Sequence, residues 1–131
     1  MYLRFVLARM HPDSGSRDGV FGAAYELRDG GELAASQRQE LEALLRWFDD
    51  NLQEPTRFNK TNSKGRYRRA TKGLSWLKSS AVTHIRKLRH LISILEDHGF
   101  HVTMIKAQNP GYIVYEDAHQ IVAEPFSDTP A

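Results

Sequence analysis

The chain has 131 residues, 40% hydrophobic and 26% charged, which suits one soluble domain with a single core. It contains no cysteine, which excludes disulfides and thiolate metal sites and agrees with a cytoplasmic location. Its 18 basic and 16 acidic residues leave a formal charge of +2, so the distribution of charge tells more than its total. No stretch approaches the roughly 20 apolar residues of a membrane span, and we expect no membrane partner.

The first third of the chain predicts a strand, a loop and a short helix. The apolar run Tyr2–Met10 is typical of a strand, and Arg4 and Arg9 indicate one partly wet face. These two cations also break the run in a way that a signal peptide does not. Glycine and proline predict a loop over residues 11–19. Residues 20–27 fit a helix or a strand, and apolar residues at i, i+3 and i+4 favour the helix.

Two longer helices are expected in the middle of the chain. Ser36 and Gln39 match a capping box, and a helical stripe of leucines follows until Pro55 ends the helix. A basic loop is expected over residues 57–73. A long helix is then predicted for residues 74–98, with Gly99 as its left-handed cap. Its apolar stripe consists of Leu74, Leu77, Ala81, Ile85, Leu88, Ile92 and Leu95.

The last third predicts three strands, at residues 100–106, 112–115 and 120–123, joined by a turn at residues 109–111 and another after residue 115. We therefore expect a single α+β domain over residues 1–131. Its small antiparallel sheet would combine the N-terminal strand with a C-terminal three-stranded meander, packed on two helices. The tail, residues 127–131, is expected to be frayed.

The most informative feature is a basic segment, residues 57–89, that holds eleven of the eighteen cations and no acidic residue. The rest of the chain carries seven cations and all sixteen acids, a formal charge of −9. Lysine and arginine at this density neutralise phosphates, and aromatic rings between them can stack on bases. The alternative is a solvated face whose cations are neutralised internally, for example by Asp49 and Asp50.

The segment supplies every candidate binding residue. We expect flexible contacts from its loop, a fixed ridge formed by Lys78, Arg86 and Arg89, and stacking or packing by Tyr67 and Trp76. The full set is Arg57, Lys60, Lys64, Arg66, Tyr67, Arg68, Arg69, Lys72, Trp76, Lys78, Arg86, Lys87 and Arg89. The partner would be nucleic acid or an acidic protein surface, although no helix-turn-helix, RNA-recognition or zinc-finger signature is present.

Signals for other chemistry are weak. The S-x-x-K pattern of Ser75 and Lys78 recurs by chance, and a helix cap is the simpler role for Ser75. The six histidines show no spacing that converges three or four metal ligands. Glycine-rich phosphate loops are absent from the sequence. We therefore expect no metal, no cofactor and no assigned catalytic residue.

The order of strand, two helices and three antiparallel strands, closing on YIVYEDAHQIV at residues 112–122, resembles small bacterial ribonuclease toxins of the RelE/ParE type. The ending PGYIVYEDAHQIVAEPF is also similar to that of small uncharacterised bacterial proteins. The toxin resemblance implies RNA cleavage by basic residues and a tyrosine of the sheet. This chain departs from that pattern, because Lys106 is the single cation in the last three predicted strands and the other cations lie earlier in the sequence.

Three functions are compatible with these observations. The first is a non-enzymatic binding module, which could serve as an inhibitor or immunity factor in a bacterial defence or toxin system. The second is a small ribonuclease, for which His84, His90 or Tyr112 would be the proton acceptor. The third is a protein-only binder or homodimer, in which the acidic helix of one copy covers the basic segment of another.

Overall fold

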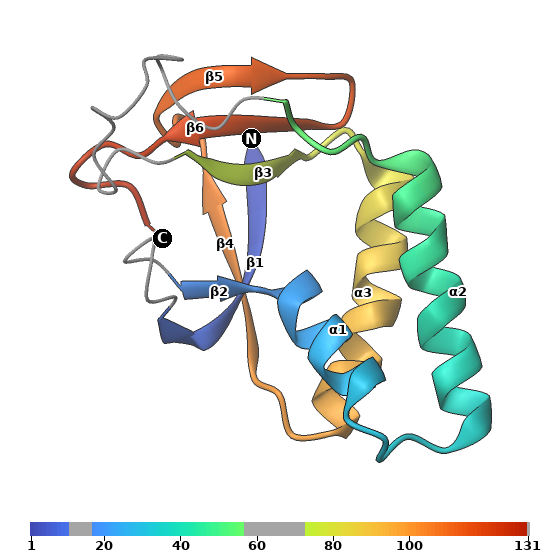
Figure 1. The fold of residues 1–131 in the computed structure, drawn as a ribbon. Coiled ribbons are helices and arrows are strands. Elements are labelled where there is room, and N and C mark those ends of the chain that lie inside the picture. The colour runs from blue at the N-terminus through green and yellow to red at the C-terminus, as the bar shows by residue number, and fades with distance from the viewer. Residues whose placement is uncertain (11–16, 57–72, 131) are drawn as a thin grey trace.

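A computed structural model describes residues 1–10, 17–56 and 73–130. Within these ranges the chain forms three helices and six strands (Figure 1). In chain order they are β1 (Tyr2–Met10), β2 (Arg17–Gly19), α1 (Val20–Asp29), α2 (Ala35–Asn51), β3 (Leu74–Lys78), α3 (Val82–Asp97), β4 (Val102–Ala107), β5 (Tyr112–Glu116) and β6 (Gln120–Glu124).

Strand β1 organises an antiparallel sheet and has three partners. One of its edges pairs with β4 from Tyr2 to Leu7. The other edge is shared: β3 pairs with Tyr2 and Leu3 at one end, while β2 pairs with Val6 and Met10 at the other. The sheet continues from β3 to β6 and β5. The overlap between β1 and β3 is short, with two paired positions. Strands β3, β6 and β5 therefore run across the end of β1 and β4 (Figure 1).

Both faces of β1 are buried, in two different cores. Leu3, Phe5 and Leu7 point into the larger core, which packs against all three helices. Val6 points into a smaller core formed with Trp76 and residues of β4 and β6. A strand that is covered on both faces reads as a continuous apolar run, and residues 5–8 of β1 form one between Arg4 and Arg9. The helices gather on one side of the sheet, with α2 outermost (Figure 1).

The expected α+β class, with an antiparallel sheet built from N-terminal and C-terminal strands, is confirmed. The pairing of the last three strands differs from the expected meander. Strand β4 pairs with β1, whereas β5 and β6 form a hairpin that continues the sheet from β3. Local turn signals identify a hairpin but carry no information on which distant strand each member joins, so this difference was not visible in the sequence.

The long helix expected over residues 74–98 is wrong in its first part, because Leu74–Lys78 forms strand β3. The helix begins at Val82. Leu74 and Trp76 enter the smaller core and Leu77 enters the larger one, so both faces of β3 are apolar. A doubly buried strand lacks the alternation that distinguishes strands from helices, which explains the error. Ser75 consequently caps no helix.

Shorter elements differ in how well the sequence predicts them. The helix favoured for residues 20–27 is confirmed as α1. Strand β2 was not expected, because three residues within a glycine-rich loop give no periodic signal. Helix α2 starts at Ala35 without a side-chain cap, so the capping box of Ser36 and Gln39 does not form. Gly99 has the expected positive φ, of 87°. The expected basic loop lies outside the described residues up to position 72.

Candidate functional site

Four of the eleven cations of the basic segment lie in the described residues: Lys78, Arg86, Lys87 and Arg89. Lys78 does not belong to the ridge that we expected. It lies at the end of β3, and its Nζ atom forms an ion pair of 2.6 Å with Glu116 of β5. This cation is therefore neutralised within the protein, because β3 places it beside the hairpin and away from α3.

The other three cations belong to α3, with Lys87 lying toward α2 and Arg89 toward the sheet. Arg86 and Arg89 are exposed, and Lys87 is partly exposed. Among the described residues, none of the three forms an ion pair with a carboxylate. Two of them contact aromatic rings instead: the Lys87 Nζ atom lies 5.6 Å from the ring centre of Trp47, and the Arg89 guanidinium lies 5.8 Å from that of Phe5. We call Arg86, Lys87 and Arg89 the α3 ridge.

Most ion pairs of the described chain draw their cations from outside the basic segment. Arg9 binds both Asp18 and Glu26, each at 2.7 Å. The hydrogen bond from Arg9 holds the pKa of the Glu26 carboxyl below its usual value. Further pairs join Arg28 to Asp29, Arg38 to Glu42, and His90 to Glu40. Asp49 and Asp50, considered as internal partners of the segment, are exposed and form no ion pair within the described residues.

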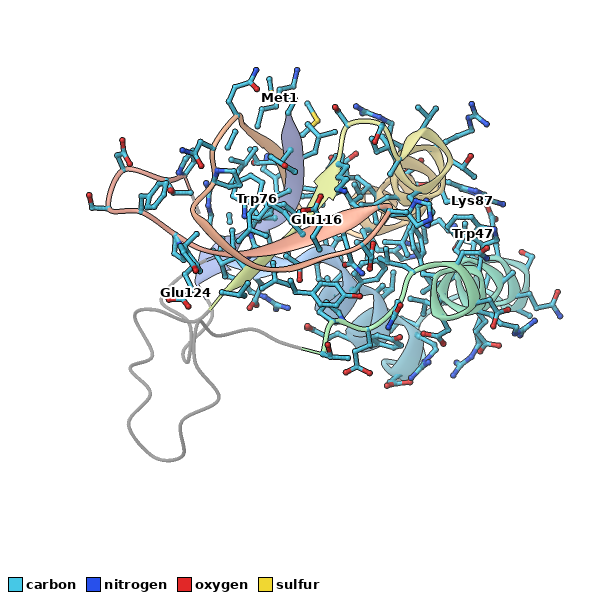
Figure 2. All side chains as sticks on the ribbon, turned by 90° about the horizontal axis from the view of Figure 1, so that it is seen from above. Met1, Trp47, Trp76, Lys87, Glu116 and Glu124 are labelled. Carbon is cyan, nitrogen blue, oxygen red and sulfur yellow. The ribbon has the colours of Figure 1, made fainter. Side chains whose placement is uncertain are left out.

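The tryptophan beside the cations of α3 is Trp47, and Trp76 does not have the stacking role expected of it. Trp76 is 1% exposed and packs in the smaller core, so it is not available for stacking on a base. Trp47 of α2, which was not singled out, lies beside Lys87 at the outer edge of the helices (Figure 2). The sequence contained a signal for Trp47, since it stands next to the apolar stripe of α2 and not on it. Its ring is partly buried.

The remaining candidates fall outside the described residues, so the structure does not place them. They are Arg57, Lys60, Lys64, Arg66, Tyr67, Arg68, Arg69 and Lys72.

A cavity of about 620 Å³ lies elsewhere in the described residues, and none of the three ridge residues lines it. Its walls come from β1, the first turn of α1, the C-terminal end of α2, and β3. Arg4 reaches it from β1, at the point where pairing with β3 has ended and pairing with β2 has not begun. The Arg4 Nη1 and Nη2 atoms donate to the carbonyl oxygens of Ser75, at 3.3 Å, and Arg17, at 3.0 Å.

Arg4 is an unusual cation because no carboxylate of the described residues pairs with it. Its Nε atom is buried and lacks a hydrogen-bond partner. Burial, followed by the nearby charge of Arg17, lowers the pKa of Arg4 to about 10, so the side chain is still charged at neutral pH. A buried charge without a counter-ion costs several kcal/mol. The sequence predicts a partly wet strand face at Arg4, whereas the structure encloses its Nε atom.

A cluster of polar side chains lies where α2, α3 and the β5–β6 hairpin meet. The rings of His84 and His119 stack with their centres 4.1 Å apart. His84 is buried, and its Nε2 atom lies 2.7 Å from the Asn51 carbonyl oxygen. At the adjoining turn, the Asp117 carboxylate accepts hydrogen bonds from the backbone and side chain of Gln120 and from the Tyr115 hydroxyl. The Asp117 contacts close the turn, while the stacked histidines and a hydrogen bond from the Gln120 side chain to the Gln53 carbonyl oxygen fasten the hairpin to α3 and to the segment after α2.

The proton acceptors proposed for a ribonuclease have separate surroundings. His84 lies in this buried junction, His90 bonds Glu40 on α2, and Tyr112 is 53% exposed on β5. Within the described ranges, no group of three or more histidine and acidic side chains is arranged to hold a metal ion.

Comparison with known proteins adds no relative: no family model, no curated protein and no solved structure matches this chain. Among the helices that the structure describes, none has the length and apolar character needed to cross a membrane.

Proposed function

We propose that this protein is a non-enzymatic module that binds nucleic acid through its basic segment, with the α3 ridge as the rigid part of the contact surface. One observation carries the proposal. Arg86, Lys87 and Arg89 form no ion pair within the described chain, although acidic residues pair with cations elsewhere. Charges that are not neutralised internally are available to an external anion.

The geometry of the ridge suits a phosphate backbone. Arg86 and Lys87 are adjacent, and Arg89 follows one turn of helix later, so the three charges lie within a short length of α3. Each phosphate that they neutralise releases a condensed counter-ion, which provides affinity without reading the base sequence. Trp47 beside Lys87 supplies an aromatic edge on which an unpaired base could rest.

Binding to a fluorescein-labelled oligonucleotide of about 20 nucleotides, followed by anisotropy at several salt concentrations, tests this proposal. Single-stranded DNA, single-stranded RNA and duplex DNA are compared. We expect binding that weakens steeply as salt is added. The absence of binding to all three at low salt would remove nucleic acid as the partner and leave an acidic protein surface.

The same samples distinguish the other two functions. Cleavage of the labelled RNA that persists through purification and falls in His84→Ala or His90→Ala would indicate an enzyme. Light scattering at low and high salt detects a dimer held by charge, which would dissociate as salt is added. A monomer that binds RNA and leaves it intact is the result that we expect.

A further inference from the structure

The cavity beside Arg4 has the size and composition of a ligand site that is independent of the α3 ridge. At about 620 Å³ it lies within the range of small-molecule pockets. Much of its wall is apolar, with Phe48 and Leu52 on the α2 side and Leu77 on β3. A pocket of this kind binds the body of a ligand by burial and uses a few polar groups to orient it.

Two enclosed donors beside the cavity lack acceptors among the described residues. The Arg4 Nε atom has no hydrogen-bond partner, and neither has the indole Nε1 atom of Trp76, which is buried as well. Helix α1 begins at the same cavity, with Gly19 as an N-cap that makes no side-chain hydrogen bond. The first turn of α1 has no acidic residue, so its free amide groups and partial positive charge are not offset there.

The acids that line the cavity do not neutralise Arg4. Asp18 is held by Arg9 at 2.7 Å. Asp49 and Glu54 are exposed and lie toward the C-terminal end of α2. The lining thus combines a cation and a helix N-terminus with an apolar wall and two exposed carboxylates. These two carboxylates disfavour a ligand with several negative charges, such as a nucleoside triphosphate.

We propose that this cavity binds a small organic monocarboxylate, with its carboxylate on Arg4 and the N-terminus of α1 and its apolar body against Phe48 and Leu52. Two of the five N–H groups of Arg4 are used by the carbonyl oxygens of Ser75 and Arg17, which hold the guanidinium in place. The Nε–H group is enclosed by protein atoms, so the remaining Nη–H donors are the ones left for a carboxylate. The ligand supplies the counter-ion that the described residues do not provide.

The first test compares a carboxylate with its neutral amide. The protein is titrated with 3-phenylpropionate, octanoate and indole-3-acetate, and with 3-phenylpropanamide, while amide shifts are followed by NMR. We expect at least one carboxylate to bind with a Kd below about 10 mM, and at least about tenfold tighter than its amide. Equal affinity for acid and amide, or no binding by any of the three acids, would overturn the proposal.

Two variants locate the site. Arg4→Gln removes the charge and should weaken the carboxylate at least about tenfold. Gly22→Phe leaves Arg4 intact and fills the cavity, since Gly22 lines it and a Cβ atom there would meet nothing within 4 Å. It should also weaken binding at least about tenfold. Arg46→Gln, on an exposed α2 position outside the cavity, is the charge-matched control and should bind normally.

Gly22→Phe keeps the test decisive if Arg4→Gln does not fold, which circular dichroism would show. Unchanged affinity in a folded Arg4→Gln or in Gly22→Phe would refute the assignment. The α3 ridge variant described below should bind the carboxylate as the wild type does. Failure of nucleic-acid binding and failure of carboxylate binding are therefore distinguishable results.

Discussion

The α3 ridge and the Arg9 cluster show two opposite uses of arginine within one small domain. In the Arg9 cluster, one guanidinium binds Asp18 and Glu26, and the three charges connect β1, β2 and α1. On the α3 ridge, Arg86, Lys87 and Arg89 have no acidic partner within the described chain. The comparison shows that a high content of cations does not by itself indicate a binding surface. Cations that already pair with the protein's own carboxylates must first be left out of the count.

The largest effect is expected from removing the ridge. The triple variant Arg86→Gln, Lys87→Gln, Arg89→Gln should weaken nucleic-acid binding by more than about tenfold, because each cation that binds a phosphate contributes about 1 kcal/mol. The matched control, Arg9→Gln, Arg28→Gln, Arg38→Gln, changes the net charge equally but removes paired cations. Anisotropy should show a loss of affinity of less than about threefold for this control. Equal losses of affinity in the two triple variants would contradict the comparison.

The salt dependence sharpens the same contrast. For single strands, the slope of log K against log salt has a magnitude of about 0.7 for each phosphate that the protein neutralises. The ridge variant should therefore have a slope smaller by up to about 2, while the paired-cation control keeps the slope of the wild type. An unchanged slope in the ridge variant would mean that these cations face solvent and bind no phosphate.

Acid stability should depend on charges that are used internally. Burial tends to raise the pKa of Asp117, but hydrogen bonds from the His119 amide, Gln120 and Tyr115 outweigh it, and the pKa is lowered. The stability that results is present above about pH 4 and is lost as the pH falls through the lower pKa of the folded state.

Asp117→Asn should therefore reduce the free energy of unfolding by about 1 kcal/mol at pH 7 and flatten its decline below pH 4. Urea denaturation across this pH range measures both effects. Glu26→Gln is the control, because the pKa of Glu26 is also lowered but its carboxylate is exposed, and its effect should be smaller. The ridge variant should leave the pH profile unchanged.

The smallest effect is expected within the basic segment itself. Lys78 is paired with Glu116 at 2.6 Å, so Lys78→Gln should change nucleic-acid affinity less than about twofold. Arg86→Gln, the same type of change at an unpaired position, should have the larger effect in the same anisotropy assay. A Lys78 variant that weakens binding as much as Arg86→Gln would show that the ion pair opens when the partner binds.

Local sequence patterns were sufficient where one element determines its own structure. The stripe of leucines in α2, the turn before Tyr112 and the left-handed Gly99 each follow from side chains within a few residues of one another. The charge asymmetry of residues 57–89 is likewise a property of the sequence alone. These features depend on short-range sterics and composition, which do not require knowledge of the neighbours in space.

Tertiary structure decided which neighbours each residue has. Pairing with both β1 and β6 makes Leu74–Lys78 a strand and buries Trp76, although its apolar spacing also fits a helix. Lys78 pairs with Glu116 only because the hairpin returns beside β3. Arg4 becomes a partly buried cation at the place where β2 and β3 divide one edge of β1 between them. Burial and ion pairing depend on residues that are close in space but distant in sequence, so a local sequence pattern cannot predict them.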